Sequence, residues 1–324
     1  MTRRKFIGLL GVAVAWASSA RAQQPSKIPR VVYLDGRSRN ASAEGLLSGL
    51  RDLGYVDGKN IVLIRQQFSA PSVKGMREAI LEGVPNADIL VVSGTVGGVA
   101  AKSVPLSIPV VFISVGAPVD IGLIDSLAHP GGNMTGTTFE ATSETYAKRL
   151  QILKEIMPGL SRVAVLGAKD DPNFPFAMVS LNQSAPEQSV SLSRIDLDST
   201  DDLEGAFNAI KQSGAEALIV VAGSLTYGLI QRTADLALAR GLPTCHGFKE
   251  AVAAGGLVSL GPDLIALARQ SARMVDKIIR GERVADIPVE QPAQYMVSVN
   301  LKTAKALGLT IPPTLLARAD EVIE

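Results

Sequence analysis

The chain has 324 residues, of which 47% are apolar, 4% aromatic and 19% charged, and its 32 basic side chains nearly balance 31 acidic ones. The length suggests two domains, the apolar fraction excludes a disordered chain, and the few aromatics argue against an aromatic-lined nucleic-acid platform. One cysteine and two histidines exclude an internal disulfide and a Cys-rich zinc site and argue against a multi-His centre, so we expect no metal and no cofactor.

The first 22 residues indicate an export signal. A basic Arg3-Arg4-Lys5 start precedes an apolar run from Ile7 to Ala17, and Ala20-Arg21-Ala22 ends the segment. A basic start, an apolar middle and a small-x-small exit are typical of a secretory signal peptide, and the paired arginines resemble the twin-arginine export motif. The run is shorter than the roughly 20 residues that span a bilayer. We therefore expect residues 1–22 to be a signal peptide that is cleaved after Ala22.

Removal of this segment changes the charge balance. It takes away four basic side chains and no acidic one, which leaves a net charge of −3. No basic run stands out in the remaining sequence, so attraction to a phosphate backbone has little to act on. Nucleic acid is therefore not an expected partner.

Short apolar runs recur along the remaining chain, bounded by Gly, Pro, Asp or Ser. Runs of this length without polar alternation are typical of parallel strands that are buried on both faces. Between them lie stretches with helical periodicity, such as 43–53, which places Leu46 and Leu50 on one face. The expected strands are 31–34, 61–64, 89–92, 110–113, 163–166, 217–221 and 257–260, and the expected helices are 43–53, 145–157, 203–210, 229–239 and 264–279.

The alternation of strands and helices predicts α/β layers with right-handed crossovers. Because there are too many strands for one comfortable sheet, we expect two doubly wound parallel-sheet lobes joined by a hinge. Breaks at 130–133, 254–256 and 286–292 suggest three crossings between the lobes. The N-terminal lobe would then be 29–136 plus 258–286, and the C-terminal lobe 137–257 plus 287–324. The alternative is two sequential domains joined once near Pro130.

The candidate binding site lies at the carboxyl ends of the strands, where open α/β sheets bind their ligands. These ends are rich in Gly and hydroxyl-bearing residues, and they expose backbone N–H groups at the start of the next helix, which favours a carboxylate. Each such residue could equally cap a helix or form a tight turn, so the site rests on the whole set. The candidates are Asp35, Ser38, Ser93, Gly94, Thr95, Ser114, Val115, Gly116, Asp171, Asn173, Gly223, Ser224, Thr226 and His246.

No motif in the sequence indicates catalysis. The adjacent Cys245 and His246 suggest a thiol and a base, but neighbouring residues on a strand point to opposite faces. Residues 94–98 (GTVGG) lack the G-x-G-x-x-G spacing of a dinucleotide loop. Asp170-Asp171 and Asp201-Asp202 are adjacent acids rather than a converging pair, and the G-x-S-x-G, H-E-x-x-H and phosphate-loop patterns are absent. We therefore expect a protein that is not an enzyme.

Seven segments, spread in order from about Pro29 to the end, carry a more specific pattern than any single motif. They are 49–60 (GLRDLGYVDGKN), 108–112 (IPVVF), 126–136 (SLAHPGGNMTG), 148–155 (KRLQILKE), 254–259 (AGGLVS), 301–309 (LKTAKALGL) and 318–324 (RADEVIE). Together they resemble the family of periplasmic substrate-binding components of ABC transporters that includes the tryptophan/tyrosine-type binding proteins.

This resemblance implies the type I periplasmic-binding fold with three interlobe crossings, and binding without turnover. It implies a periplasmic location, a small-molecule ligand, an ABC permease in the inner membrane as partner, and a monomer. In amino-acid binders of similar fold, residues after the third and fourth strands hold the ligand carboxylate, which here correspond to Ser93–Thr95 and Ser114–Gly116. The other lobe would contribute Asp171, Asn173 and residues 223–226.

Two departures from the family pattern bear on the ligand. The family commonly has Asp-Pro-Val where this chain has Ala117-Pro118-Val119, and often Ser-Tyr-Gly where it has Ser259-Leu260-Gly261. The missing acid removes an expected partner for a ligand amine, and Asp120 lies three positions away. An aromatic or other small organic carboxylate is therefore expected as readily as an amino acid.

Two other classes of protein remain open from the sequence. A periplasmic ligand-sensing domain could present its bound form to a receptor rather than to a permease. A secreted enzyme could use the same α/β scaffold, because a fold does not fix the chemistry.

Overall fold

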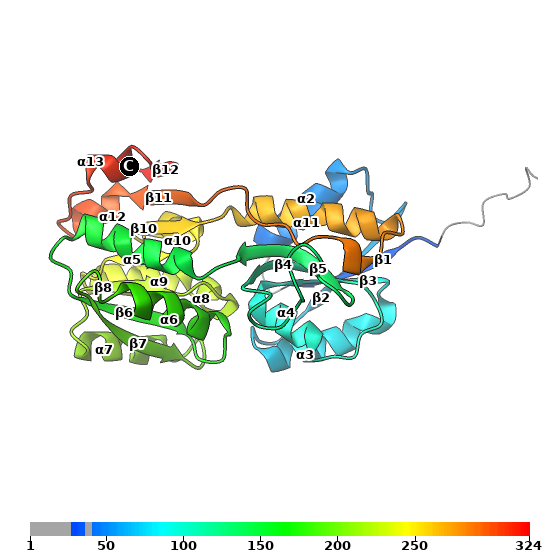
Figure 1. Cartoon of the computed structure of the whole chain (residues 1–324), viewed down its shortest axis with the longest axis horizontal. Coiled ribbons are helices and arrows are strands. Elements are labelled where there is room, and N and C mark those ends of the chain that lie inside the picture. The colour runs from blue at the N-terminus through cyan, green and yellow to red at the C-terminus, as the bar shows by residue number, and fades with distance from the viewer. Residues whose placement is uncertain (1–26, 36–40) are drawn as a thin grey trace, which may run out of the picture.

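Two sheets organise the chain, one in each of two lobes that lie side by side along the long axis of the molecule (Figure 1). The computed structural model describes residues 27–35 and 41–324. The expected fold class, two doubly wound α/β lobes, is confirmed. The expected signal peptide (residues 1–22) lies outside the described residues.

The first lobe is a parallel sheet with helices on both faces. It comprises β1 (Arg30–Asp35), β2 (Val62–Gln67), β3 (Ile89–Ser93), β4 (Val110–Gly116), β5 (Met134–Glu140), α2 (Ala41–Asp52), α3 (Val73–Gly83), α4 (Gly94–Lys102) and α11 (Leu264–Ile279), with short 3₁₀ turns η2 (Val84–Asn86) and η3 (Val284–Asp286). The strand order is β2-β1-β3-β4-β5. Helices α3 and α4 cover one face. On the other face α2 and α11 pack together, and Leu46, Leu50, Ala268 and Ala272 join Val31 in one apolar cluster.

The second lobe is a longer, mixed sheet. It comprises β6 (Arg162–Ala168), β7 (Ser191–Leu197), β8 (Ala217–Val220), β9 (Thr244–His246), β10 (Val258–Gly261), β11 (Met296–Asn300), β12 (Glu321–Ile323), α5 (Glu144–Ile156), α6 (Asn173–Ser184), α7 (Leu203–Gln212), α8 (Ser224–Gly228), α9 (Ile230–Ala239), α10 (Lys249–Ala253), α12 (Leu301–Ala306) and α13 (Pro313–Leu316). The strand order is β12-β11-β10-β9-β8-β6-β7; β10 and β11 are antiparallel and the other neighbours are parallel. Helices α5 and α6 pack on one face, and α7 and α9 on the other.

The strands and helices expected from apolar periodicity are all present, but several strands were not expected, among them β7, β11, β12 and the polar strand β5. Its sequence, MTGTTFE, contains three threonines, yet all seven residues are buried. Two of the threonine hydroxyls donate to backbone oxygens, Thr135 to Ile287 at 2.8 Å and Thr138 to Val115 at 2.7 Å. The third, on Thr137, accepts from the backbone N–H of Ser114 at 3.1 Å. A polar strand is buried here because its hydroxyls have partners.

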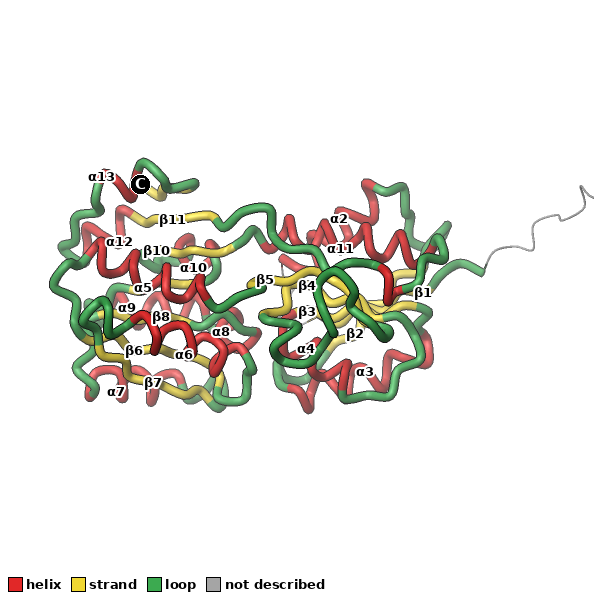
Figure 2. Tube along the Cα trace, viewed as in Figure 1, coloured by secondary structure: helices red, strands yellow, loops and turns green. Residues whose placement is uncertain are grey.

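The chain crosses between the lobes three times, after β5, after β10 and again between Glu290 and Met296, as the loops of Figure 2 show. This excludes the alternative of two sequential domains. The lobe boundaries differ from those expected, because β10 pairs with β9 and β11 in the second sheet. Residues 287–290, in contrast, stay with the first lobe: Val289 N donates to Leu127 O, and Glu290 N to Gly136 O beside β5.

Buried polar contacts join the three crossings. Arg149 of α5 is fully buried and forms an ion pair with Glu140, the last residue of β5. The same guanidinium donates to the carbonyl oxygen of Leu260 in β10, at 2.9 Å from Nε and 2.8 Å from Nη2. The Tyr295 hydroxyl, which precedes β11, donates to the carbonyl oxygen of Phe139 at 3.2 Å. We refer to Arg149, Glu140 and Tyr295 as the hinge cluster.

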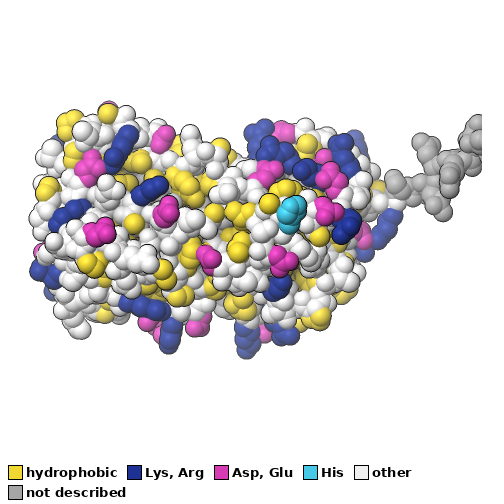
Figure 3. Space-filling model, in the orientation of Figure 1, with side chains coloured by type: hydrophobic (Ala, Val, Ile, Leu, Met, Phe, Trp, Pro, Cys, Tyr) yellow, Lys and Arg dark blue, Asp and Glu magenta, His cyan; other side chains and the backbone are white. Residues whose placement is uncertain are grey.

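The surface carries no dominant sign of charge on the face seen in Figure 3, where basic and acidic side chains are interspersed over both lobes. Within the described residues, no helix has both the length and the apolar character that crossing a membrane requires. The same residues contain no group of three or more His, Cys, Asp or Glu placed to hold a metal ion.

Candidate ligand-binding site

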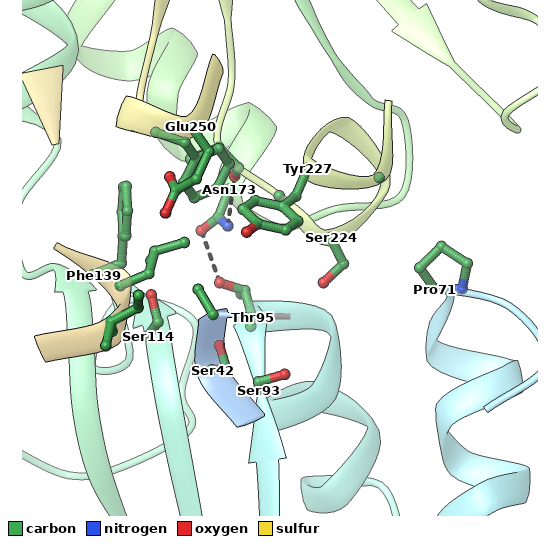
Figure 4. Close-up of a pocket in the computed structure, with 18 of the residues that line it drawn as sticks. Ser42, Pro71, Ser93, Thr95, Ser114, Phe139, Asn173, Ser224, Tyr227 and Glu250 are labelled. Atoms are coloured by element: carbon green, nitrogen blue, oxygen red, sulfur yellow. Dashed lines mark hydrogen bonds between the residues drawn. The ribbon is translucent and has the colours of Figure 1, made fainter. Parts of the chain in front are cut away.

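A cavity of about 610 Å³ lies between the lobes, at the carboxyl ends of the strands. This volume is within the range of about 300–1,000 Å³ that is typical of small-molecule sites. Figure 4 shows Ser42, Ser93, Thr95 and Ser114 on the first-lobe side, and Asn173, Tyr227 and Glu250 on the second-lobe side. A ligand in this cavity would therefore contact both lobes.

A hydrogen-bond chain connects the lobes at the base of the cavity. The hydroxyl of Thr95, at the start of α4, accepts from Gly116 N at 2.9 Å and donates to Asn173 Oδ1 of the other lobe at 3.0 Å. Asn173 Nδ2 donates to the carbonyl oxygen of Ala222 at 3.0 Å, beyond the end of β8. A Cβ atom at Gly116 would lie 2.2 Å from Asn173 Oδ1, so the lobes meet this closely because residue 116 is glycine.

The end of β4 is shaped by an irregularity that aims Ser114 at the cavity. The pairing register between β4 and β5 shifts after Phe112, and Ser114 has a φ of 59°, a left-handed conformation that is uncommon outside glycine. Ser114 N is bonded to the Thr137 hydroxyl, which holds this turn in place. Strained backbone of this kind is often found where a protein positions a group for function.

Half of the fourteen candidate residues line the cavity. They are Ser93, Gly94, Thr95, Ser114, Asn173, Gly223 and Ser224. The side chain of Asp35 and the whole of Ser38 lie outside the described residues.

Five candidates do not line the cavity, and each has another role. Val115 packs in the apolar core of the first lobe. Gly116 and Asp171 lie behind the wall, where Gly116 N donates to Thr95 and Asp171 Oδ1 accepts from Asn173 N at 3.0 Å. Thr226 donates to the carbonyl oxygen of Val221 at 2.7 Å and so holds the turn before α8. His246 is buried in β9, and burial, followed by the charge of Arg149, lowers its pKa to about 3.

One wall of the cavity is aromatic and was not predicted from the sequence. Phe248 lies between Phe139 and Tyr227, with ring centroids 5.3 Å and 5.0 Å away, and all three line the cavity together with Phe68. Phe68, Tyr227 and Phe248 follow the ends of strands and Phe139 belongs to β5, but the sequence pattern at those ends indicates only the small and polar residues as candidates. Burial, followed by the nearby charge of Glu250, raises the pKa of the Tyr227 hydroxyl to about 12. The wall is therefore apolar, with a protonated phenol at its edge.

Glu250 of α10 was also missed. Its Oε2 atom is buried and, within the described part of the chain, has no hydrogen-bond partner. Burial raises the pKa of this carboxyl. The preceding residue, Lys249, is engaged with Asp263 at 2.5 Å, so it does not neutralise Glu250 by direct contact.

Two lobes, three crossings and a cavity walled by both lobes define a hinged solute-binding protein of the type I periplasmic-binding fold. The chain belongs to the family of ABC transporter substrate-binding proteins, whose family model matches residues 27–323. The protein is thus a solute-binding component of an ABC system that takes a small organic ligand.

Individual relatives agree with this assignment. The chain is 23% identical to the "Tyrosine-binding protein" of Clostridioides difficile (strain R20291) over 274 residues, which cover 84% of this chain and 78% of that protein. A conserved domain protein from Vibrio cholerae has a similar structure, with a TM-score of 0.82, 26% identity and coverage of 91% of this chain and 100% of the other. An ABC domain from Streptococcus pneumoniae, solved in complex with L-Trp, has a TM-score of 0.81 at 21% identity, with coverage of 91% and 100%.

Proposed function

We propose that this protein captures a small organic carboxylate in the interlobe cavity and delivers it to an inner-membrane permease. The observation that carries the proposal is the cavity whose walls come from both lobes. A ligand that contacts both walls binds the closed arrangement more tightly than the open one, and this difference in affinity drives closure. The permease would recognise the closed form. ATP hydrolysis belongs to another subunit, so the chain itself performs no reaction.

The ligand carboxylate is proposed to lie where β3 ends and α4 begins. The N–H groups of the first helical turn lack intrahelical partners and carry partial positive charge, which favours an anion. Ser93, the N-cap of α4, makes no capping hydrogen bond within the described structure, so its hydroxyl is available to a ligand. Ser114 offers a second hydroxyl from β4. Thr95 has a supporting role in this arrangement, because its hydroxyl already bonds to Gly116 and Asn173.

The rest of the ligand is proposed to be aromatic. Phe139, Tyr227 and Phe248 offer a continuous ring surface against which a planar group can stack. The names of two relatives mention tyrosine and L-Trp, both of which combine a carboxylate with an aromatic ring. The cavity volume is sufficient for ligands of this size.

Export is part of the proposal. Residues 1–22 would direct the chain to the periplasm, where cleavage after Ala22 would release a monomeric binding protein. Cell fractionation tests this directly: the processed chain is expected in the periplasmic fraction, and replacement of Arg3 and Arg4 by lysine is expected to retain the precursor in the cytoplasm. Processed protein in the periplasm at normal levels in that variant would exclude the twin-arginine route.

Binding and transport need separate tests. Isothermal titration of the protein with L-tyrosine, L-tryptophan and 4-hydroxybenzoate is expected to give saturable binding of at least one aromatic carboxylate with unchanged ligand recovered afterwards. Absence of binding by any of them would contradict the proposal, and turnover would favour an enzyme. Uptake of the labelled ligand is expected to fall in a deletion strain, whereas unchanged uptake would favour a sensor.

A further inference from the structure

The second-lobe wall of the cavity contains a carboxylate with one buried oxygen that the described residues leave without a partner. Glu250 Oε2 is buried, and no described residue forms a hydrogen bond with it. The basic residue next to it, Lys249, is held 2.5 Å from Asp263, the N-cap of α11. Figure 4 shows the Glu250 side chain directed into the cavity from the second lobe. A carboxylate removed from water without a partner is costly, and such groups are normally paired.

The charge of the cavity also favours a cationic partner for Glu250. The described lining residues include two acids, Glu44 and Glu250, and no lysine or arginine. A ligand that carries only a carboxylate would add negative charge to a cavity that already has an acidic excess. A ligand that carries an ammonium group as well would pair with the buried acid.

Two rings of the aromatic wall, Tyr227 and Phe248, lie on the same side of the cavity as Glu250. Phe248 is two residues before Glu250 and contacts both Phe139 and Tyr227. The faces of aromatic rings attract cations, so these rings and the carboxylate both favour the binding of an ammonium group.

We propose that Glu250 binds the ammonium group of the ligand, so that the ligand is a zwitterionic amino acid with an aromatic side chain rather than a simple aromatic carboxylate. This inference rests on the proposed function, in which the first lobe holds the carboxylate. The two charged ends of the ligand are then held by different lobes. A zwitterion therefore makes a charged contact with each lobe and draws the lobes together, whereas the same molecule without its amine makes its charged contact with the first lobe alone.

The test uses pairs of ligands that differ only in the amine: L-tyrosine with 3-(4-hydroxyphenyl)propionate, and L-tryptophan with indole-3-propionate. Each is titrated into the wild-type protein, into Glu250→Gln and into Glu187→Gln. The last variant removes the same charge from an exposed position in the same lobe. Small-angle scattering with and without each ligand reports closure.

We expect the wild type and Glu187→Gln to bind at least one amino acid about 10- to 100-fold more tightly than its deaminated partner. This factor is typical of one hydrogen bond between charged groups, which the deaminated ligand cannot form. In Glu250→Gln most of this difference should disappear, while the deaminated ligand still binds, which also demonstrates a folded variant. In the wild type and in Glu187→Gln, compaction on binding should require the amine of the ligand, and in Glu250→Gln this requirement should be lost.

Two results would overturn the inference and leave the proposed function intact. One is equal affinity of the wild type for the amino acids and their deaminated partners. The other is a preference for the amine that survives unchanged in Glu250→Gln. If none of these ligands and no other aromatic carboxylate binds, the proposed function is overturned, and the inference with it.

Discussion

The hydroxyl of Thr95 in the first lobe donates a hydrogen bond of 3.0 Å to the Asn173 side-chain oxygen in the second. Both residues are buried, and Thr95 also accepts from Gly116 N, so one hydroxyl connects the end of β4 with the opposite lobe. Closure of the cavity is thus coupled to the loop that is proposed to hold the carboxylate.

Replacement of this hydroxyl should weaken ligand binding. In Thr95→Ala both Gly116 N and Asn173 Oδ1 lose their partner inside the closed protein, so we expect the binding free energy to fall by about 1–3 kcal/mol. Isothermal titration measures the loss, and Thr95→Ser, which keeps the hydroxyl, is the matched control. Equal affinity of Thr95→Ala and wild type would exclude this role.

Gly116→Ala should prevent closure more completely. The added Cβ would lie 2.2 Å from Asn173 Oδ1, which real structures do not tolerate, so the lobes must separate. We expect small-angle scattering to show no compaction on addition of ligand, and affinity to fall at least as much as in Thr95→Ala. The control is Gly159→Ala, where a Cβ meets nothing within 4 Å. Normal compaction in Gly116→Ala would contradict the closed geometry.

Ser114→Ala tests the proposed carboxylate contact itself. The substitution removes one hydroxyl from the cavity wall and leaves the backbone bond from Ser114 N to Thr137 in place. We expect the affinity for a carboxylate ligand to fall by about 1–3 kcal/mol, with little change in the melting temperature of the ligand-free protein. A loss of stability with unchanged affinity would assign Ser114 a purely structural role.

The hinge cluster should be essential for stability. In Arg149→Met the buried Glu140 loses its ion-pair partner, and the carbonyl oxygen of Leu260 loses two donors. Breaking a buried pair from one side typically costs about 3–5 kcal/mol. Denaturant unfolding should show this loss, and the double variant with Glu140→Gln should recover part of it. A double variant no more stable than Arg149→Met would mean that the uncompensated charge is not the cause.

Asp171 should make stability depend on pH. Burial raises its pKa from 3.8 to about 6, so the folded protein binds this proton more tightly than the unfolded chain does. The resulting stabilisation is complete below about pH 3.8 and is lost as the pH rises through about 6. Asp171→Asn removes this dependence. The wild type should therefore lose about 2 kcal/mol of stability between pH 4.5 and pH 7.5 that the variant keeps, so the difference between the two free energies of unfolding changes by that amount. An equal difference at the two pH values would show that Asp171 titrates normally.

The apolar sequence pattern was sufficient to predict the general fold. Runs such as 89–92 and 110–113 become the central strands β3 and β4, which are buried on both faces. The pattern failed for β5, where burial depends on long-range hydrogen bonds from threonines, including the bond of Thr135 to Ile287. It also misplaced β10, because a short apolar run does not reveal which of two sheets it joins.

Half of the candidate site residues line the cavity, and the rest of its lining depends, like β5, on long-range contacts. Small residues at strand ends pointed to Ser93, Ser114 and Asn173, which line the cavity, because the carboxyl edge of a parallel sheet is a general binding position. Glu250 and Phe248 escaped notice because nothing local distinguishes them from surface and core residues. Their role follows from where the second lobe meets the first, which is a property of tertiary structure alone.

The pairing of α11 with α2 has a consequence for the synthesis of the protein. The apolar face formed by Val31, Leu46 and Leu50 is covered by a helix that emerges from the ribosome only after most of the second lobe has been made. The second sheet is completed only after β11 and β12 have been synthesised, and both follow α11 in the chain. Neither half can mature alone, so a truncated chain would expose a bare apolar face, and no single cut could release an intact half.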